Sequence, residues 1–226
     1  MTAVGAEVVR IPKASGDYPV ALQKYLADRA PGAIWAQGSP GLLQEKPVAL
    51  LCSVKCPGNL ILKTYDLARS LRDAGTPVIS GFHSPMEKEC LDLLLRGKQP
   101  VIACAARRLT SSRLLTKFAI PLKEGRLLFL SPFGPKTRRA TTETAVSRNE
   151  LVAALADRVF VPYASGASKT EALCRKVLEW GKLLLTFDSK ETQLLIALGA
   201  LPCDSSVLLT HRYVRTSETV EITPSS

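Results

Sequence analysis

The stretch Ser80–Glu87, with the sequence SGFHSPME, combines residue types that can hold a phosphate group. It follows a short apolar run and precedes a run with helical periodicity, so we expect a sharp turn from a strand into a helix. A glycine lets a ligand approach the backbone, and the unpaired N–H groups of the first helical turn, with the helix dipole, favour an anion. The turn therefore predicts phosphate contacts from four residues, Gly81, Phe82, His83 and Ser84.

Three further stretches offer the same small, hydroxyl and basic residues. Two of them, Cys52–Gly58 (CSVKCPG) and Ser165–Thr170 (SGASKT), follow apolar runs, and the third reaches Arg148 and Asn149. The S-x-x-E spacing of residues 147–150 indicates a capping box, which places that pair in a helix's first turn. Glycines allow close approach, hydroxyls donate, and Lys or Arg supply counter-charge. The residues that we expect to contact phosphate here are Ser53, Lys55, Gly58, Arg148, Asn149, Gly166, Ser168, Lys169 and Thr170.

Plainer structural roles are open for several of these residues. His83 also suits a role limited to capping the helix, and Phe82 suits packing at the strand end instead of stacking on a base. Trp35 lies within an apolar pattern that is typical of core residues. Glu87 suits the start of a helix, where its replacement by Gln should cost well under about 1 kcal/mol.

The elements between these stretches alternate regularly. Apolar runs predict strands at 33–37, 48–51, 78–80, 101–104, 127–130, 159–162 and 183–187, and helical patterns lie at 20–29, 60–74, 87–96, 112–122, 148–156, 169–180 and 191–198. Continuous apolar strands separated by helices imply an α/β fold, a mostly parallel sheet with helices on both faces that binds ligands at the carboxyl ends of its strands. We expect one main domain over 33–206, an N-terminal extension with a short helix over 1–32, and a final strand and polar tail over 207–226.

Composition limits the class of protein. With 226 residues, 46% of them hydrophobic, the chain can bury a core. No apolar run approaches the length of a membrane span and the N-terminus has no signal-peptide core, so we expect a cytoplasmic protein without a membrane partner. Its six cysteines have no C-x-x-C spacing, which favours buried thiols over a metal site or a disulfide framework.

The net charge of +10 is concentrated in one segment. Residues 107–148 contain ten Lys or Arg and two acids, a balance of +8. Such a cluster is typical of proteins that bind nucleic acids or nucleotides, and a solvated basic face is the alternative.

At these residues the chain resembles the DNA-processing protein A (DprA/Smf) family, and more widely the Rossmann-like superfamily that also contains the lysine-decarboxylase-like (LOG) proteins. The resemblance covers about residues 33–200. Residues 48–53 are similar to the first core strand of the family, 80–87 to its second glycine turn, 148–149 to an Arg-Asn pair that opens a later helix, and 165–170 to the turn after the fifth strand. The resemblance implies a core that binds single-stranded DNA and passes it to a recombinase.

The chain also departs from the family pattern. Cys52, Ser53 and Val54 stand where the family has Gly-Ser-Arg, and Lys55 is placed to replace the missing charge. The sequence has no room for the flanking helical domains of the long family members, so it resembles a compact, core-only relative.

An enzyme alternative comes from the lysine-decarboxylase-like branch, whose Pro-Gly-Gly-x-Gly-Thr-x-x-Glu motif acts on the ribosyl bond of a nucleoside monophosphate. The matching stretch has no Glu two or three residues after Thr170, and Glu171 is expected to point elsewhere on its helix. Glu87 is the one remaining candidate acid. We therefore predict no catalytic residue and no cofactor.

The sequence thus predicts a protein of DNA uptake and recombination that binds single-stranded DNA through a phosphate-binding crevice. A nucleotide-binding sensor and a nucleoside-monophosphate phosphoribohydrolase are the alternatives. A recombinase partner and a homodimer are open.

Overall fold

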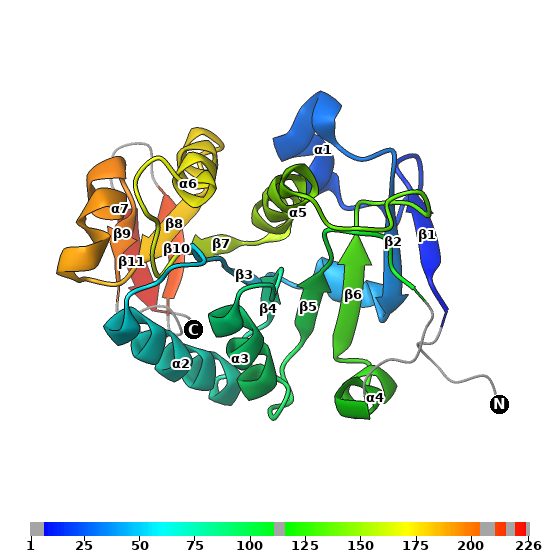
Figure 1. Ribbon diagram of the computed structural model, residues 1–226, viewed down its shortest axis with the longest axis horizontal. Coiled ribbons are helices and arrows are strands. Elements are labelled where there is room, and N and C mark those ends of the chain that lie inside the picture. Colours follow the sequence, from blue (N-terminus) through cyan, green and yellow to red (C-terminus); the bar gives the residue numbers. More distant parts are fainter. Residues whose placement is uncertain (1–6, 111–115, 204–210, 216–219, 225–226) are drawn as a thin grey trace.

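The apolar runs of the sequence form one nine-stranded sheet, in a computed structural model that describes residues 7–110, 116–203, 211–215 and 220–224 (Figure 1). The strand order is β1-β2-β6-β5-β4-β3-β7-β8-β9, in which β1, β2 and β6 pair antiparallel and all other neighbours pair parallel. The strands are β1 (Val9–Pro12), β2 (Ala33–Gly38), β3 (Val48–Leu50), β4 (Val78–Ser80), β5 (Val101–Cys104), β6 (Leu127–Ser131), β7 (Arg158–Phe160), β8 (Leu183–Thr186) and β9 (Leu201–Pro202).

Helices cover both faces of this sheet because its strands are apolar on both sides. Within β3, Val48 and Leu50 pack into the core on one face, and Ala49 packs into the core on the other. The first face carries α2 (Gly58–Asp73), α3 (Pro85–Leu94) and α4 (Thr116–Lys123), and the second carries α1 (Val20–Leu26), α5 (Thr142–Leu155), α6 (Lys169–Glu179) and α7 (Gln193–Leu198) (Figure 1). Three short 3-10 turns lie at Ala27–Arg29, Pro40–Gln44 and Lys190–Thr192. The prediction of a Rossmann-like α/β fold with helices on both faces is confirmed.

The strand order places a switch point beside β3. The chain runs from β3 to β4, β5 and β6 on one side of it, then returns to β7, β8 and β9 on the other side. The loops that leave the carboxyl ends of β3 and β7 therefore diverge there, and such crevices hold the ligands of open α/β sheets.

The chain ends and two helices differ from the sequence-based expectation. The N-terminal extension supplies β1, which pairs with β2, and the expected final strand is accompanied by a second one, so that β10 (His211–Arg215) pairs with β11 (Val220–Pro224). The helix expected at 112–122 begins at Thr116 in the described residues, and 111–115 lie outside them. The helix expected to start at Arg148 starts six residues earlier, at Thr142.

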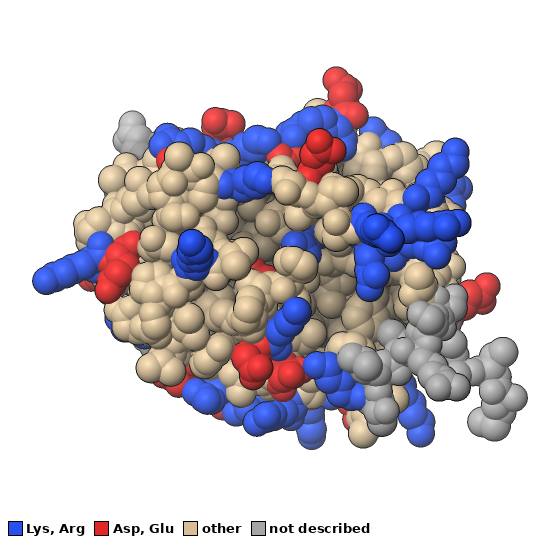
Figure 2. All heavy atoms as spheres, viewed as in Figure 1, with Lys and Arg blue, Asp and Glu red and all other residues tan. Residues whose placement is uncertain are grey.

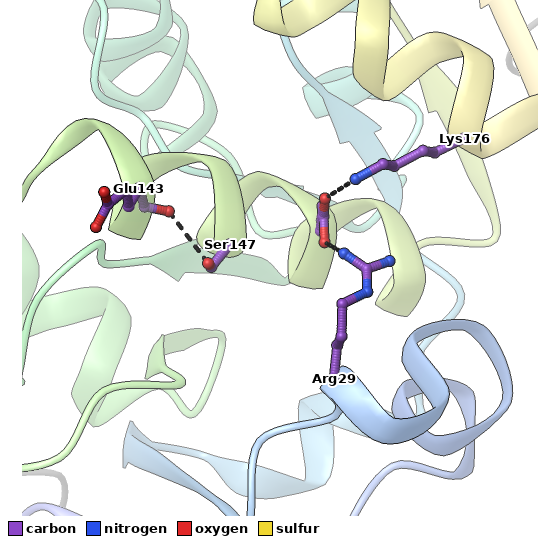
Figure 3. Close-up of polar contacts among 5 residues, drawn as sticks. Arg29, Glu143, Ser147 and Lys176 are labelled. Atoms are coloured by element: carbon purple, nitrogen blue, oxygen red, sulfur yellow. Dashed lines mark hydrogen bonds and ion pairs between the residues drawn. The ribbon is translucent and has the colours of Figure 1, made fainter.

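One carboxylate ties three helical segments of the second face together. Glu150 on α5 accepts from Arg29 Nη1 at 2.5 Å with one oxygen and from Lys176 Nζ on α6 with the other (Figure 3). The Glu150 side chain is nearly buried, whereas both cations are partly exposed. This ion pair network joins α5, which carries Arg148, to α6, which carries Lys169.

Candidate functional site

The turn between β4 and α3 is a capping box closed by its own carboxylate. Ser84 Oγ accepts from the Glu87 N–H at 3.2 Å, and Glu87 Oε2 accepts from the N–H groups of His83 at 2.9 Å and Ser84 at 3.1 Å. Glu87 Oε1 also accepts from the Cys52 N–H of the neighbouring loop at 3.3 Å. The buried Glu87 thus occupies the N–H groups that the sequence assigned to a phosphate.

Gly81 makes room for an arginine. A Cβ built on Gly81 would lie 2.0 Å from Nη1 and 2.2 Å from Cζ of Arg148. The Arg148 guanidinium reaches across this glycine to donate from Nη1 to the Cys104 carbonyl at 3.0 Å and from Nε to Asn149 Oδ1 at 2.7 Å. The glycine is therefore required by a contact between β4, β5 and α5.

Arg148 is the seventh residue of α5, so it lies in the second turn of this helix and not in the first. The prediction of a capping box at 147–150 is wrong. Thr141 caps the helix instead, with its Oγ1 accepting from the Thr144 N–H at 3.2 Å. Ser147 lies within the helix, where its Oγ donates to the Glu143 carbonyl at 3.1 Å (Figure 3). Only 4% of Arg148 is exposed, and this burial lowers its pKa although the charge of Glu87 opposes the shift.

Phe82 and His83 point in different directions. The Phe82 backbone has a φ of +44°, and its ring is buried in the core beneath α2 and α3, so it is placed for packing and not for stacking on a base. His83 is exposed beside the site.

The turn after β7 is held by hydrogen bonds to α6 and to the loop after β3. Ser168 caps α6, with its Oγ accepting from the Glu171 N–H at 3.1 Å, and Glu171 Oε2 accepts from the Ala167 N–H at 2.6 Å. Glu171 therefore bends back to the turn and does not point away along the helix as expected. Hydrogen bonds from Arg175 and from the Ala167 N–H lower the pKa of the Glu171 carboxyl. Ser53 Oγ in the loop after β3 accepts from the Ser165 N–H at 3.3 Å, which joins the two loops.

These loops and α5 surround a cleft of about 500 Å³ at the switch point. Nine of the residues expected to contact phosphate line it: Ser53, Lys55, His83, Ser84, Arg148, Asn149, Ser168, Lys169 and Thr170. Gly58, Gly81, Phe82 and Gly166 do not. Gly58 instead starts α2, where the neighbouring Asn59 bonds to Glu191 at 2.9 Å.

Two hydroxyl residues of the lining, Thr142 and Ser165, were missed in the sequence. Ser165 belongs to the turn already singled out, and Thr142 follows the cap of α5 in the run TTET, whose hydroxyl residues signal a helix start.

The cleft is suited to an anion. Lys55 and Lys169 are exposed and have no carboxylate partner among the residues that the structure describes, and Arg148 Nη2 has no protein acceptor there. The first N–H groups of α6 add the positive end of a helix. Among the lining residues Glu87 is the one acid, and its oxygens are engaged by three N–H groups.

The Cys52 thiol also lines the cleft. Its hydrogen bond with Cys56, followed by burial, raises its pKa, so the thiol stays protonated and is a poor nucleophile. No group of three or more His, Cys, Asp or Glu in the described ranges is arranged to hold a metal ion. No helix among the residues described has the length and apolarity to cross a membrane.

The fold is similar to two solved DNA processing proteins. The DNA processing protein A (DprA) from Streptococcus pneumoniae matches with a TM-score of 0.74 at 18% identity, over 88% of this chain and 72% of that one. The DNA processing protein A from Helicobacter pylori, described with its single-stranded DNA binding mode, matches with a TM-score of 0.70 at 17% identity, over 91% of this chain and 96% of that one.

Comparison with the curated protein sequences gave no match. The model of the DNA recombination-mediator protein A family matches residues 10–201, which include the whole nine-stranded sheet apart from the first and last residues of its edge strands. The chain therefore belongs to the DNA recombination-mediator protein A family.

Proposed function

We propose that this protein binds single-stranded DNA, with a phosphate of the strand held in the cleft, and that it carries out no reaction of its own. The observation that carries the proposal is the convergence of Lys55, Lys169 and Arg148 on one cleft at the switch point of the sheet. Cations and free N–H donors at the carboxyl edge of a parallel sheet bind phosphate. The single-stranded DNA binding described for the Helicobacter pylori protein agrees with this assignment.

The charge beyond the cleft favours a strand over a mononucleotide. Thr142 lines the cleft, and the six residues that precede it in the chain include Lys136, Arg138 and Arg139, all exposed. A mononucleotide would use the cleft alone, whereas a polynucleotide would also gain from these neighbouring cations.

A hydrolase role is disfavoured by the state of Glu87. A general acid or base must reach the substrate within hydrogen-bond distance. Both oxygens of Glu87 are already acceptors for backbone N–H groups, so the carboxylate serves to close the turn.

Binding of labelled oligothymidylates of graded length, with mononucleotides as competitors, tests the proposal. Affinity should rise with length, and a mononucleotide should compete weakly because it forms few phosphate contacts. Length-independent binding that a mononucleotide displaces would indicate a nucleotide sensor. Release of free base from adenosine monophosphate would indicate a hydrolase.

Substitution of the two cleft lysines locates the binding. Lys55→Ala and Lys169→Ala should each weaken oligonucleotide binding roughly tenfold, because each removes one charge-assisted contact. Lys169→Ala should leave thermal stability equal or slightly higher, since a cation in a helix's first turn opposes the dipole. Lys190→Ala is the control, because Lys190 also opens a helical turn but does not line the cleft. Unchanged affinity in both cleft variants would remove the cleft from the binding site.

Family membership extends this proposal to DNA recombination in the cytoplasm, where the bound strand would be passed to a recombinase. Transfer of a labelled strand from this protein to a purified recombinase tests that role. A homodimer would present two clefts to one strand, and sedimentation with and without oligothymidylate tests it.

A further inference from the structure

A second hollow, of about 430 Å³, lies beside the loop that leads from β6 towards α5. Its volume falls in the range of small-ligand pockets. Two aromatic rings, Trp35 from β2 and Phe133, line it together with Arg108. The remaining lining residues are Val8, Leu109, Thr110, Gly134 and Pro135.

The two aromatic side chains are not part of either hydrophobic core. Neither Trp35 nor Phe133 is buried in a core cluster or packed against one, although the strand pattern of the sequence indicated a core role for the tryptophan. Gly134 lies directly against the indole, because a Cβ there would come within 2.9 Å of Cζ2 and Cη2 of that ring. The loop thus holds the indole in place at the wall of the pocket while both residues stay partly exposed.

The two loops that line this pocket carry five cations without carboxylate partners in the described part of the chain: Arg108 in the lining itself, and Arg107, Lys136, Arg138 and Arg139 beside it in sequence. Residues 101–110 and 127–142 contain no Asp or Glu. Figure 2 shows Lys and Arg gathered over this loop, at the right of the view. Arg108 joins the two loops, because its N–H donates to the Thr137 carbonyl at 2.9 Å and its Nη1 to the Pro135 carbonyl at 3.3 Å.

We propose that the pocket of Trp35 and Phe133 binds a nucleobase of the same strand whose phosphate lies in the cleft, an inference that rests on the proposed function. Aromatic rings stack on any base, and the cations beside them bind the flanking phosphates. The two sites are close along the chain: Pro135 lines the pocket and Thr142 lines the cleft, and the seven residue-to-residue steps from one to the other span at most about 25 Å. One strand can therefore pass from the cleft over Arg138 and Arg139 to the pocket.

Fluorescence of Trp35 tests this proposal. Trp180, the second tryptophan, packs against Tyr25 on the far helix layer, with 5.6 Å between ring centroids. In a Trp180→Phe variant, oligothymidylates long enough to reach both sites should quench the emission of Trp35, whereas a mononucleotide should not. If that variant is unstable, the difference between the wild type and Trp35→Phe gives the same signal.

A ring-removing substitution supplies the second readout. Phe133→Leu should weaken binding of long oligothymidylates roughly 5- to 150-fold, the loss expected for one stacked base, and leave binding of the shortest oligomers unchanged. Unchanged Trp35 emission and unchanged Phe133→Leu affinity, with binding that still depends on Lys169, would overturn this inference alone. Absence of oligonucleotide binding by the wild type would overturn the proposed function as well.

Discussion

Gly81 and Arg148 are separated by 66 residues in the chain but lie in contact in the fold. This contact changes the role that the sequence indicated for each of them. A glycine at the end of a strand indicates open space for a ligand, yet the space beside Gly81 is filled by a guanidinium. Arg148 in turn keeps Nη1 for the Cys104 carbonyl and is left with Nη2 for the cleft. Sequence spacing cannot reveal this pairing, because it exists only once β4, β5 and α5 are packed together.

Gly81→Ala should therefore destabilise the fold by about 1–3 kcal/mol, the usual result of forcing extra volume into a packed site. Denaturant unfolding measures this change. Gly166→Ala is the matched control, since no atom lies within 4 Å of a Cβ built there. Equal stability of the two variants would show that Arg148 leaves its position without penalty.

Glu87 has a larger structural role than its place at a helix start suggested. Glu87→Gln replaces a buried carboxylate that accepts from three N–H groups with an amide that has one accepting oxygen. At least one N–H loses its acceptor, so we expect a loss of about 1–3 kcal/mol in unfolding free energy, more than the sequence predicted. Thermal unfolding of Glu87→Gln measures this loss of stability. The control is Glu143→Gln, which changes an exposed acid in the first turn of α5. A loss as small as that of the control would contradict the role of Glu87 in closing the turn.

At the scale of elements, the parallel strands were predictable because their runs are apolar throughout. The edge strand β1 was missed, since it is short and its residues Val9 and Arg10 are exposed. The start of α5 was misplaced because the S-x-x-E pattern at 147–150 is formally a cap, whereas the hydroxyls of Thr141 and Thr144 provide the actual one. Two stretches of this sequence can each cap a helix, and the tertiary packing determines which of them is the start of α5.

Lys182, the residue before β8, caps the C-terminus of α5. It is buried, and its ammonium donates to the carbonyls of Ala153, Ala154 and Ala156 at the helix C-terminus while lying 4.4 Å from the centre of the Tyr25 ring. Such a cation satisfies carbonyls that have no intrahelical partner. Burial lowers the pKa of Lys182 from 10.5 to about 8.

The stability of the fold should therefore respond to alkaline pH through Lys182. Between pH 8 and 10.5 the unfolded chain binds a proton at this lysine and the folded chain does not, so this group makes unfolding less favourable as pH rises. The gain is on the order of 3 kcal/mol over the window, which Lys182→Met should lack. Urea unfolding at both ends of the window compares the wild type with Lys182→Met and with Lys88→Met, an exposed control on α3 that should keep the wild-type profile. Parallel profiles for all three proteins would contradict a lowered pKa.

Across the whole molecule, only part of the basic segment 107–148 stays without carboxylate partners among the described residues. The sequence predicted the +8 segment, and the fold divides it between loops at the carboxyl ends of β5 and β6 and residues paired elsewhere, such as Arg126 with Glu124 and Lys117 with Asp92. Cations in such ion pairs already have a carboxylate partner, so the unpaired loop cations are the ones available to a strand. Which cations stay unpaired depends on tertiary neighbours, and the sequence could not predict it.

Salt dependence of oligothymidylate binding tests this distribution of charge. Each neutralised phosphate of a single strand contributes a slope of about −0.7 to the logarithm of affinity against the logarithm of salt. Arg138→Ala with Arg139→Ala should therefore reduce the steepness by up to about 1.4 and lower affinity equally for oligomers of different base, because phosphate contacts carry no sequence information. The control is Arg96→Ala with Lys98→Ala, which removes the same charge from an exposed loop at the amino end of β5 and should keep the wild-type slope. Equal slopes in both double variants would mean that net charge alone attracts the strand, and a flat slope in the wild type would contradict DNA as the ligand.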